Sequence, residues 1–528
     1  MIKKNNSFDT NDPAKIWSKY CGFLDLSMAE FMNIQENLLL EEMKLVINSP
    51  ISQKIINGKT PSTISEFRQQ VPLTSYDDYA PFITDKNESH LAEKPDYWAR
   101  TSGKGGTPKW IPYAKKSIDL AGELGVASLI LASASERGQV TITNGVRVIQ
   151  NLAPRPYFTG FVAAAMLEEM DIYSIPPFIE YEDKPFEERV RYGFNLALRN
   201  GVDIIGSMSS IIIKIGEQFT DSSRSVKLSR TMMNPKIMFR LMRALYRSKK
   251  EKRSMLPKDL WPTKGMVCYG MDTTLYRDKI RLYWGTNPLE MYASTEGSIM
   301  SMQAWNKKGL TFIPYCAFFE FIPEEEWLRN REDNSYKPTT VLLNEVEEGK
   351  SYEVVITNFY GMPFLRYRMG DMVKFISLED NEAGIRLPQM VFQCRANDII
   401  DIAGFTRLDE QTIWQSINNT GVQYNGWTAR KEADGEHPVL HVYIEAKNCN
   451  NGAELGKNIH EQLRIVDEDY NNMHLMLGIS PIKVTLLPQG SFQSYYESKR
   501  KKGADLAHLK PQQMNASDSD IEQLLHPD

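Results

Sequence analysis

The sequence predicts an α/β protein with two unequal domains, a large N-terminal domain of mixed α/β architecture and a smaller α+β domain after it. The first reason is length, because 528 residues exceed one ordinary domain. The second is the alternation of helical and strand patterns between residues 186 and 359, and the third is a change of pattern past Gln393. We therefore expect domains at 1–390 and 391–512, followed by a flexible tail at 513–528.

The N-terminal third carries three recognisable patterns. Residues 13–58 have apolar side chains at helical spacing and predict a helical region. Residues 117–133 are typical of an amphipathic helix, whose N-terminal end we expect near the glycine-rich stretch before it. Residues 139–152 alternate around Asn144-Gly145, which predicts a hairpin.

The middle and the end of the chain alternate between helices and strands. Residues 186–200 predict a helix that ends at Gly201, and residues 202–205 a buried strand after it. Further strands are expected at 265–270, 312–322, 351–359, 439–445 and 482–487, and further helices at 409–417 and 453–470. These alternations indicate a mixed sheet covered by helices.

Residues 235–252 predict a helix whose last turns read RSKKEKR. Lysine and arginine near a helix C-terminus complement the negative end of its dipole. We interpret this run as a solvated last turn in preference to an anion site.

Composition narrows the class of protein. Hydrophobic residues make up 42% and charged residues 24%, which is ordinary for a globular chain. The net charge of −5 gives no general reason to expect nucleic acid or an anionic membrane as a partner. Five scattered cysteines without a CxxC motif indicate a reducing compartment. No apolar stretch is long enough for membrane insertion, so we expect a cytoplasmic protein.

The stretch TSGKGGTPKWIP at residues 101–112 has the composition of a phosphate-binding loop. Glycines let the backbone N–H groups approach an anion, while hydroxyl and ammonium groups supply further donors. The stretch matches neither the Walker pattern nor the dinucleotide GxGxxG pattern. A mobile surface turn is the alternative interpretation.

Two carboxylates stand in settings suited to a nucleotide site. Glu296 lies in YASTEG, between small hydroxyl residues and Gly297, where an exposed carboxylate could hold Mg²⁺. Asp371 follows Arg366 and Arg368 in LRYRMGD and could accept hydrogen bonds from both ribose hydroxyls. The alternatives are a plain strand-to-loop turn for Glu296 and a surface Arg–Asp pair for Asp371.

Taken in order, four motifs strengthen one another. TSGKGGTPKW, EMYASTEG, FLRYRMGD and CRANDIIDIAGFTRLDE resemble, in sequence and spacing, the signature series of the adenylate-forming superfamily. Within it, the chain looks most like the auxin-responsive Gretchen Hagen family of acyl-acid amido synthetases. FRQQVPLTSYDDYAPFI and GSFQSYYESKRKKGADLAHLKP are similar to that family's segments. The resemblance covers about residues 65 to 512.

The resemblance implies roles for individual positions and a mobile C-terminal domain. Thr295 and Glu296 would contact the α-phosphate, with Glu296 also binding Mg²⁺, and Asp371 would hold the ribose. Arg395 heads the C-terminal domain as a nucleotide-binding residue, and Asn397 occupies the hinge position. A loop would hold the ATP phosphates through Ser102, Gly103, Lys104, Gly105, Gly106 and Lys109. Lys510 would be the late lysine that reaches back toward the adenylate.

The chain departs from the family pattern at several positions. Lys104 and Gly105 replace the usual Ser or Thr, so phosphate would meet an ammonium and backbone N–H groups there. Thr406 stands where the superfamily has arginine, with Arg407 one position later. Lys510 precedes Pro-Gln-Gln instead of a Pro-Arg ending.

The function implied is a ligase that uses ATP and Mg²⁺ to convert a carboxylic acid into an acyl-adenylate and passes the acyl group to an amine, expected to be an amino acid. One alternative transfers the acyl group to coenzyme A or a carrier protein as a thioester. A second is a nucleotide-binding protein without turnover.

Overall fold

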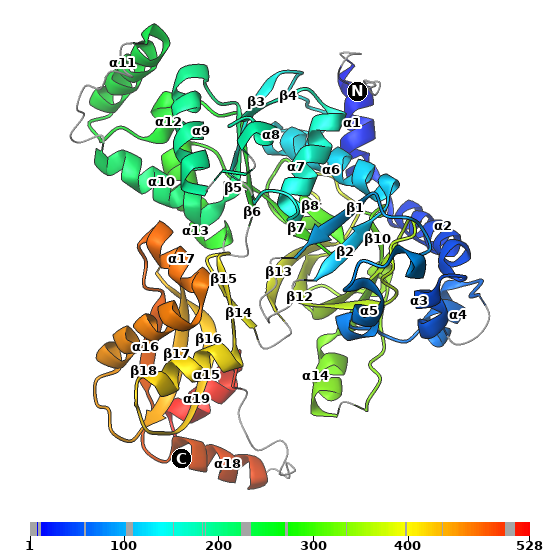
Figure 1. Cartoon of the computed structure of the whole chain (residues 1–528), viewed down its shortest axis with the longest axis vertical. Helices are drawn as coiled ribbons and strands as arrows, with labels where there is room; N and C mark the ends of the chain where they lie inside the picture. The colour runs from blue at the N-terminus through cyan, green and yellow to red at the C-terminus, as the bar shows by residue number, and fades with distance from the viewer. Residues whose placement is uncertain are drawn as a thin grey trace. The chain divides into compact units, whose positions relative to one another are not determined.

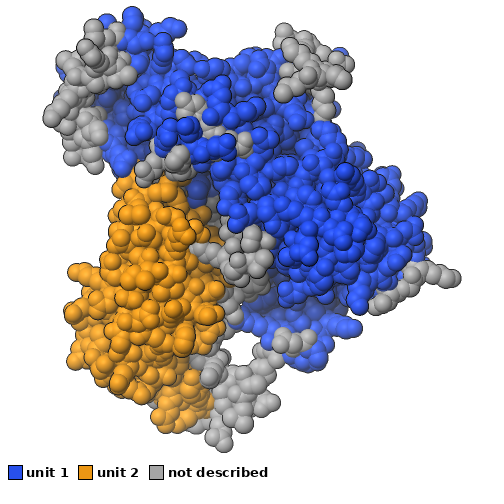
Figure 2. Space-filling view, viewed as in Figure 1, with its two compact units in different colours: residues 1–208, 215–269, 277–394 blue, residues 209–214, 270–276, 395–528 orange. Residues whose placement is uncertain are grey.

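The computed structural model describes residues 8, 12–56, 60–101, 109–151, 153–181, 183–184, 186–222, 234–269, 273–333, 335–395, 399–435, 437–501 and 513–527. The chain divides into two compact units, which Figure 2 shows in different colours. The first comprises residues 1–208, 215–269 and 277–394, and the second comprises residues 209–214, 270–276 and 395–528. None of the described helices is both long and apolar enough to cross a membrane.

The first unit is built on an eleven-stranded sheet (Figure 1). Its parallel half runs in the order β4 (Ile172–Ile175), β3 (Val146–Asn151), β5 (Ile204–Met208), β6 (Gly265–Tyr269) and β7 (Leu289–Ser294). The sheet continues through β8 (Ser298–Gln303), β9 (Leu310–Phe312), β13 (Gln389–Arg395), β12 (Tyr367–Ser377), β11 (Ser351–Asn358) and β10 (Ala317–Pro323). Strand β7 pairs in parallel with β6 and antiparallel with β8, so the direction changes there. The predicted mixed α/β fold is confirmed.

Helices accompany this sheet along the chain. They are α1 (Pro13–Cys21), α2 (Met28–Val46), α3 (Pro50–Ile55), α4 (Ile64–Gln70), α5 (Tyr76–Ile83), α6 (Lys115–Ser133), α7 (Phe158–Glu169), α8 (Phe178–Tyr181), α9 (Phe186–Asn200), α10 (Ser209–Ser222), α11 (Pro235–Lys250), α12 (Pro257–Leu260), α13 (Thr273–Trp284) and α14 (Glu324–Glu332). Helix α6 is buried around almost its whole circumference, because it packs on α7 as well as on β6 and β8. Lys307 donates from Nζ to the carbonyls of Leu131 and Ala134 and so satisfies the end of α6.

The second unit has its own sheet and core. Strands β16 (Tyr424–Asp434), β17 (His437–Ala446) and β18 (Ile482–Leu486) form a three-stranded sheet, and β14 (Ile399–Ile402) pairs with β15 (Thr406–Asp409). The helices are α15 (Glu410–Asn419), α16 (Gly452–Val466), α17 (Glu468–Leu477), α18 (Ser491–Lys501) and α19 (Asp518–Leu525). Trp427, Val442 and Ile459 belong to one buried cluster. This is the predicted smaller α+β part of the fold.

Two expectations are wrong. Residues 139–145 form no strand, and Asn144-Gly145 is a turn that leads into the parallel strand β3, so there is no hairpin. The segment 513–528, expected as a flexible tail, contains α19. Ile521 and Leu524 are buried, and the Tyr495 hydroxyl donates to Asp520 at 2.7 Å. Apolar residues three positions apart gave this short segment a buried face despite its acidic composition.

Candidate active site

The glycine-rich loop connects two short antiparallel strands, β1 (Tyr97–Arg100) and β2 (Trp110–Tyr113). The Thr101 N–H donates to the Lys109 carbonyl at 3.0 Å, which closes the base of the loop. The predicted phosphate contacts within it, Ser102, Gly103, Lys104, Gly105 and Gly106, lie outside the described residues.

Helix α6 begins at Lys115, two residues before the expected start at 117, and β2 lies between it and the glycine-rich stretch. That its dipole favours the phosphates stays a prediction, because residues 102–108 lie outside the described ranges.

Lys109 is described and lies half-buried at the C-terminal side of the loop. Its Nζ is 4.5 Å from the centre of the Tyr76 ring, a cation–π distance. Burial raises the pKa of Tyr76, and the charge of Glu296 adds to that rise. Lys109, Tyr76 and Glu296 therefore occupy the same region of the first unit.

Thr295 and Glu296 lie in the turn between β7 and β8. The turn is held through its backbone: the Thr295 carbonyl accepts from the Tyr113 hydroxyl at 2.7 Å, and the Glu296 carbonyl accepts from Asn358 Nδ2 at 2.9 Å. The Gly297 N–H donates to Ser294 Oγ at 2.8 Å. Both the Thr295 and the Glu296 residues remain partly exposed, so their side chains are accessible to a ligand.

Close packing favours glycine at position 297, because a larger residue would have to displace the Met300 side chain. A Cβ at this position would lie 2.5 Å from Met300 Sδ, closer than such atoms approach. The tight turn that the sequence predicted around Glu296 is therefore present, between two strands of the sheet.

Asp371 lies on β12 and is only 2% exposed. Its Oδ2 accepts from the Tyr292 hydroxyl at 2.9 Å, and Tyr292 is in β7, the strand that ends at the Thr295–Glu296 turn. This bond brings the second and third motifs together. It is also a contact that sequence reasoning missed, because the two residues are 79 positions apart.

The arginines before Asp371 pair with other acids. Arg366 donates from Nε and Nη2 to Glu320, each at 2.9 Å, and Arg368 donates to Glu353. The Arg366 and Glu320 side chains are 7% and 1% exposed, so this is a buried ion pair. The alternative interpretation of Asp371 as a surface partner of these arginines is wrong.

Three further predicted positions belong to the C-terminal part of the site. Asn397 and Lys510 lie outside the described residues. Arg395 is the last residue of β13, and the structure describes its backbone but not its side chain.

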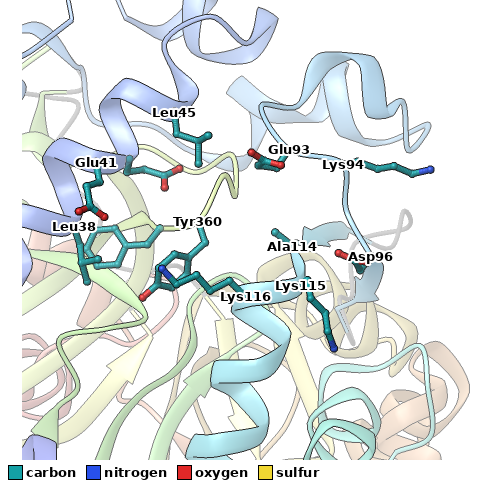
Figure 3. A pocket seen from close by; sticks show the side chains of 12 residues that line it. Leu38, Glu41, Leu45, Glu93, Lys94, Asp96, Ala114, Lys115, Lys116 and Tyr360 are labelled. Carbon is teal, nitrogen blue, oxygen red and sulfur yellow. The ribbon is translucent and has the colours of Figure 1, made fainter. Parts of the chain in front are cut away.

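A separate pocket of about 340 Å³ lies in the first unit (Figure 3). Glu41, Glu93, Lys116 and Tyr360 are among its lining residues, and none of the described motif residues is. Burial raises the pKa of Glu42, another residue of the lining, to about 8. The pocket is thus distinct from the described residues of the first three motifs.

Metal binding at the motif residues would rest on Glu296. Among the described residues, no group of three or more His, Cys, Asp and Glu side chains could enclose a metal ion. Mg²⁺ commonly takes one or two carboxylates and completes its shell with phosphate oxygens and water. The partly exposed carboxylate of Glu296 beside the Thr295 hydroxyl fits that donor set.

Solved structures define the class of fold. An acyl acid amido synthetase, AtGH3.15 in complex with 2,4-DB, has a TM-score of 0.53 at 17% identity, covering 98% of this chain and 97% of that one. A 2-hydroxyisobutyryl-CoA ligase has a TM-score of 0.55 at 14% identity, covering 88% and 87%. The fold is therefore that of the adenylate-forming enzymes.

The family follows from the sequence matches. The GH3 family N-terminal domain matches residues 21–146, the central domain residues 310–395 and the C-terminal domain residues 411–519. The chain belongs to the GH3 family, as its resemblance to the Gretchen Hagen synthetases predicted.

Curated relatives are plant enzymes. A jasmonoyl-L-amino acid synthetase, GH3.5 of Oryza sativa subsp. japonica, is 27% identical over 297 residues, 50% of this chain and 48% of the relative. An indole-3-acetic acid-amido synthetase, GH3.3 of Arabidopsis thaliana, is 23% identical over 263 residues, 44% and 40% of the two chains. The matches thus span about half the length of these relatives or less.

Proposed function

We propose that this protein is an ATP- and Mg²⁺-dependent ligase that converts a carboxylic acid into an acyl-adenylate and transfers the acyl group to the amine of an amino acid. Membership of the GH3 family supports the reaction class. The name of the first relative states a jasmonoyl–amino acid product, and that of the second an amide of indole-3-acetic acid.

The observation that carries the proposal is that residues of the first three motifs, or of the strand next to them, are bonded to β7 or to the turn that follows it. Tyr292 of β7 binds Asp371, and the turn at the end of β7 holds Thr295 and Glu296. Tyr113, at the end of the strand that follows the glycine-rich loop, binds the same turn. This arrangement supports the proposal, because the residues we assign to ribose and to Mg²⁺, and the strand after the glycine-rich stretch, all contact β7 or the turn at its end.

In the first half-reaction, a carboxylate oxygen of the acid attacks the α-phosphorus of ATP. The bond from that phosphorus to the bridging oxygen breaks, and pyrophosphate leaves. Lys109 supplies positive charge near the phosphates, and the Asp371 carboxylate accepts from the ribose hydroxyls. Glu296 would hold Mg²⁺, which neutralises phosphate charge when bound.

In the second half-reaction, the amine nitrogen attacks the carbonyl carbon of the adenylate. The carbon–oxygen bond to AMP breaks, AMP leaves, and the nitrogen loses a proton to give the amide. On the resemblance alone, we assign this step to the C-terminal domain, with Lys510 reaching toward the adenylate, Arg395 binding the nucleotide and Asn397 as the hinge. We propose that this domain runs from about residue 391 through α19, because that helix belongs to the second unit.

Pyrophosphate exchange into ATP, measured with a panel of carboxylic acids, tests the first half-reaction. Exchange that depends on an acid supports adenylation, and its absence with all acids favours a nucleotide-binding protein without turnover. The mass of the product formed with amino acids or with coenzyme A then distinguishes an amide from a thioester. Coenzyme A is included as an acceptor because a CoA ligase shares the fold.

The hinge is tested by Asn397→Pro, since proline fixes φ and removes a backbone donor without altering Glu296. In a single turnover we expect adenylate to accumulate while amide appears late. Equal slowing of both steps at an unchanged melting temperature would contradict the hinge assignment.

We place the enzyme in the cytoplasm. Cys21 and Cys316 are buried free thiols, and Cys449 is a partly buried one, which supports a reducing compartment.

A further inference from the structure

Helix α11 is attached to the first unit by an unusually polar and small face. Its buried residues are Ile237, Ala244 and Ser248. Arg240 adds hydrogen bonds from Nη1 to the carbonyls of Ala197 and Leu198 in α9. The helix is thus held in place by Ile237 together with small and polar contacts, and most of its large apolar side chains are not buried.

Those large side chains are exposed to solvent instead. The exposed fractions are 70% for Phe239, 69% for Tyr246, 63% for Met242, 51% for Met238 and 38% for Leu245. Their spacing of three, four and seven residues places them on one face, opposite the buried residues. Single exposed apolar residues are common, but five on one helix face indicate a binding surface.

Basic residues flank this face along the whole helix. Residues 235–253 contain eight Lys and Arg and one Glu, whereas the whole chain has a net charge of −5. Arg240 and Arg253 are used within the first unit. The others, Lys236, Arg243, Arg247, Lys249, Lys250 and Lys252, form no ion pair with any acid in the described ranges.

The dipole interpretation of the basic run accounts for only part of this pattern. It explains Arg247, Lys249 and Lys250 in the last turns, but not Lys236 in the first turn or Arg243 in the middle. A cation in the first turn is unfavourable to the dipole, so a different partner must favour it.

We propose that α11 binds the surface of an anionic lipid bilayer, with Phe239, Met242 and Tyr246 entering the boundary between headgroups and acyl chains. An outward apolar face with flanking Lys and Arg is the pattern of helices that lie in this interface. Figure 1 shows α11 at the outer edge of the first unit, with its neighbours on one side. The positive charge attracts anionic headgroups, while the apolar side chains require a partner that is also apolar below its surface.

The test is co-sedimentation of the full chain with vesicles. One set contains phosphatidylcholine alone, and in the other about a third of the lipid is phosphatidylserine. We expect binding to the anionic vesicles, weaker binding at high salt, and little binding to phosphatidylcholine. Equal binding to both sets, or to neither, would overturn the proposal.

The apolar contribution is tested with Phe239→Ser, Met242→Ser and Tyr246→Ser together. These side chains are exposed, so the variant should fold, which a melting curve checks. The matched control changes Ile465→Ser and Leu475→Ser, which are 75% and 65% exposed in the second unit. We expect the α11 variant to lose vesicle binding and the control to retain it, and binding by both would overturn the proposal.

The electrostatic contribution is tested with Lys249→Glu and Lys250→Glu, against Lys44→Glu and Lys54→Glu as an equally charged control. Each basic residue near an anionic surface contributes about fivefold, so losing two should weaken binding at least about 25-fold. An equal effect of both pairs would mean that net charge, and not α11, governs binding. Sedimentation equilibrium measures whether the chain dimerises. If the parent forms a dimer and binds no vesicles, and the Phe239, Met242 and Tyr246 serine variant is a monomer, the apolar face of α11 binds a second copy of the chain instead.

Discussion

Tyr292→Phe is the substitution that most directly tests how the candidate site is assembled. The change removes one hydroxyl, which donates to Asp371 Oδ2 at 2.9 Å, and keeps the ring. Tyr292 is 7% exposed and Asp371 is 2% exposed, so water cannot freely replace the lost donor. We therefore expect the substitution to change the orientation and hydrogen bonding of the Asp371 carboxylate.

The magnitude follows from the charge on the acceptor. A hydrogen bond to an ionised group contributes about 1.5 to 3 kcal/mol, against about 1 kcal/mol for a neutral pair. Asp371 has further interactions, so we take the lower end of that range. About 1.5 kcal/mol corresponds to roughly a tenfold loss of ATP affinity if Asp371 must be ionised and oriented to hold the ribose.

Calorimetric titration with ATP and Mg²⁺ measures this loss, and a melting curve measures folding. Tyr360→Phe is the matched control, because the Tyr360 hydroxyl also donates a 2.9 Å hydrogen bond, to the Tyr315 carbonyl. Tyr360 lies at the separate pocket, so we expect its variant to bind ATP like the parent. The comparison separates the loss of this particular bond from the loss of any tyrosine hydroxyl.

A double-mutant cycle with Asp371→Asn completes the test. If Tyr292 acts through Asp371, the double variant should bind ATP no more weakly than Asp371→Asn alone. Additive losses would show that Tyr292 contributes elsewhere. Unchanged ATP affinity in both single variants would refute the assignment of Asp371 to the ribose.

Three further predictions address the metal, the buried ion pair and the buried acid. Glu296→Gln keeps the turn, which is held through its backbone, but removes the charge that would bind Mg²⁺. Pyrophosphate exchange should therefore fall by orders of magnitude at an unchanged melting temperature, and exchange within severalfold of the parent would contradict the assignment. Arg366→Met removes the buried partner of Glu320 and leaves it Arg68 at 3.5 Å and the Thr340 hydroxyl, so it should lower the free energy of unfolding in urea by about 1.5 to 3 kcal/mol. Lys308→Met, which breaks an exposed pair, should lower it by less than about 1 kcal/mol. Burial raises the pKa of Glu42 to about 8, above the ordinary value of 4.5, so its contribution to stability is present below pH 4.5 and declines as pH rises toward 8. Glu42→Gln should therefore gain stability relative to the parent between about pH 6 and about pH 9 in thermal melts, and a constant difference would refute this.

The elements that sequence reasoning placed correctly are those with a strong local pattern. The helix expected at 117–133 is α6, which begins at Lys115, because a long apolar periodic segment has few alternatives. The hairpin expected around Asn144-Gly145 was wrong, since an Asn-Gly turn also fits the entrance to a parallel strand. Strand direction depends on partners far along the chain, and no local pattern encodes it.

Helix α11 shows a second limit of local patterns. Its apolar spacing predicts an amphipathic helix, and the helix is present. The usual inference places the large apolar side chains inward, yet Ala244 and Ser248 face the unit and Phe239 and Tyr246 face solvent. Periodicity identifies the two faces of a helix, but only the surrounding structure decides which of them is buried.

At the candidate site, the residues that hold the geometry differ from those that the motifs identify. Thr295 and Glu296 are motif residues, but the groups that fix their turn are Tyr113 and Asn358, which lie 182 and 62 positions away. Both donate to backbone carbonyls, so any residue at the turn would be held equally well. Because the backbone fixes the position, the side chains of Thr295 and Glu296 are left for a ligand. Substitutions at Tyr113 or Asn358 should therefore displace the whole turn, whereas substitutions at Glu296 should change its chemistry and leave its position unaltered.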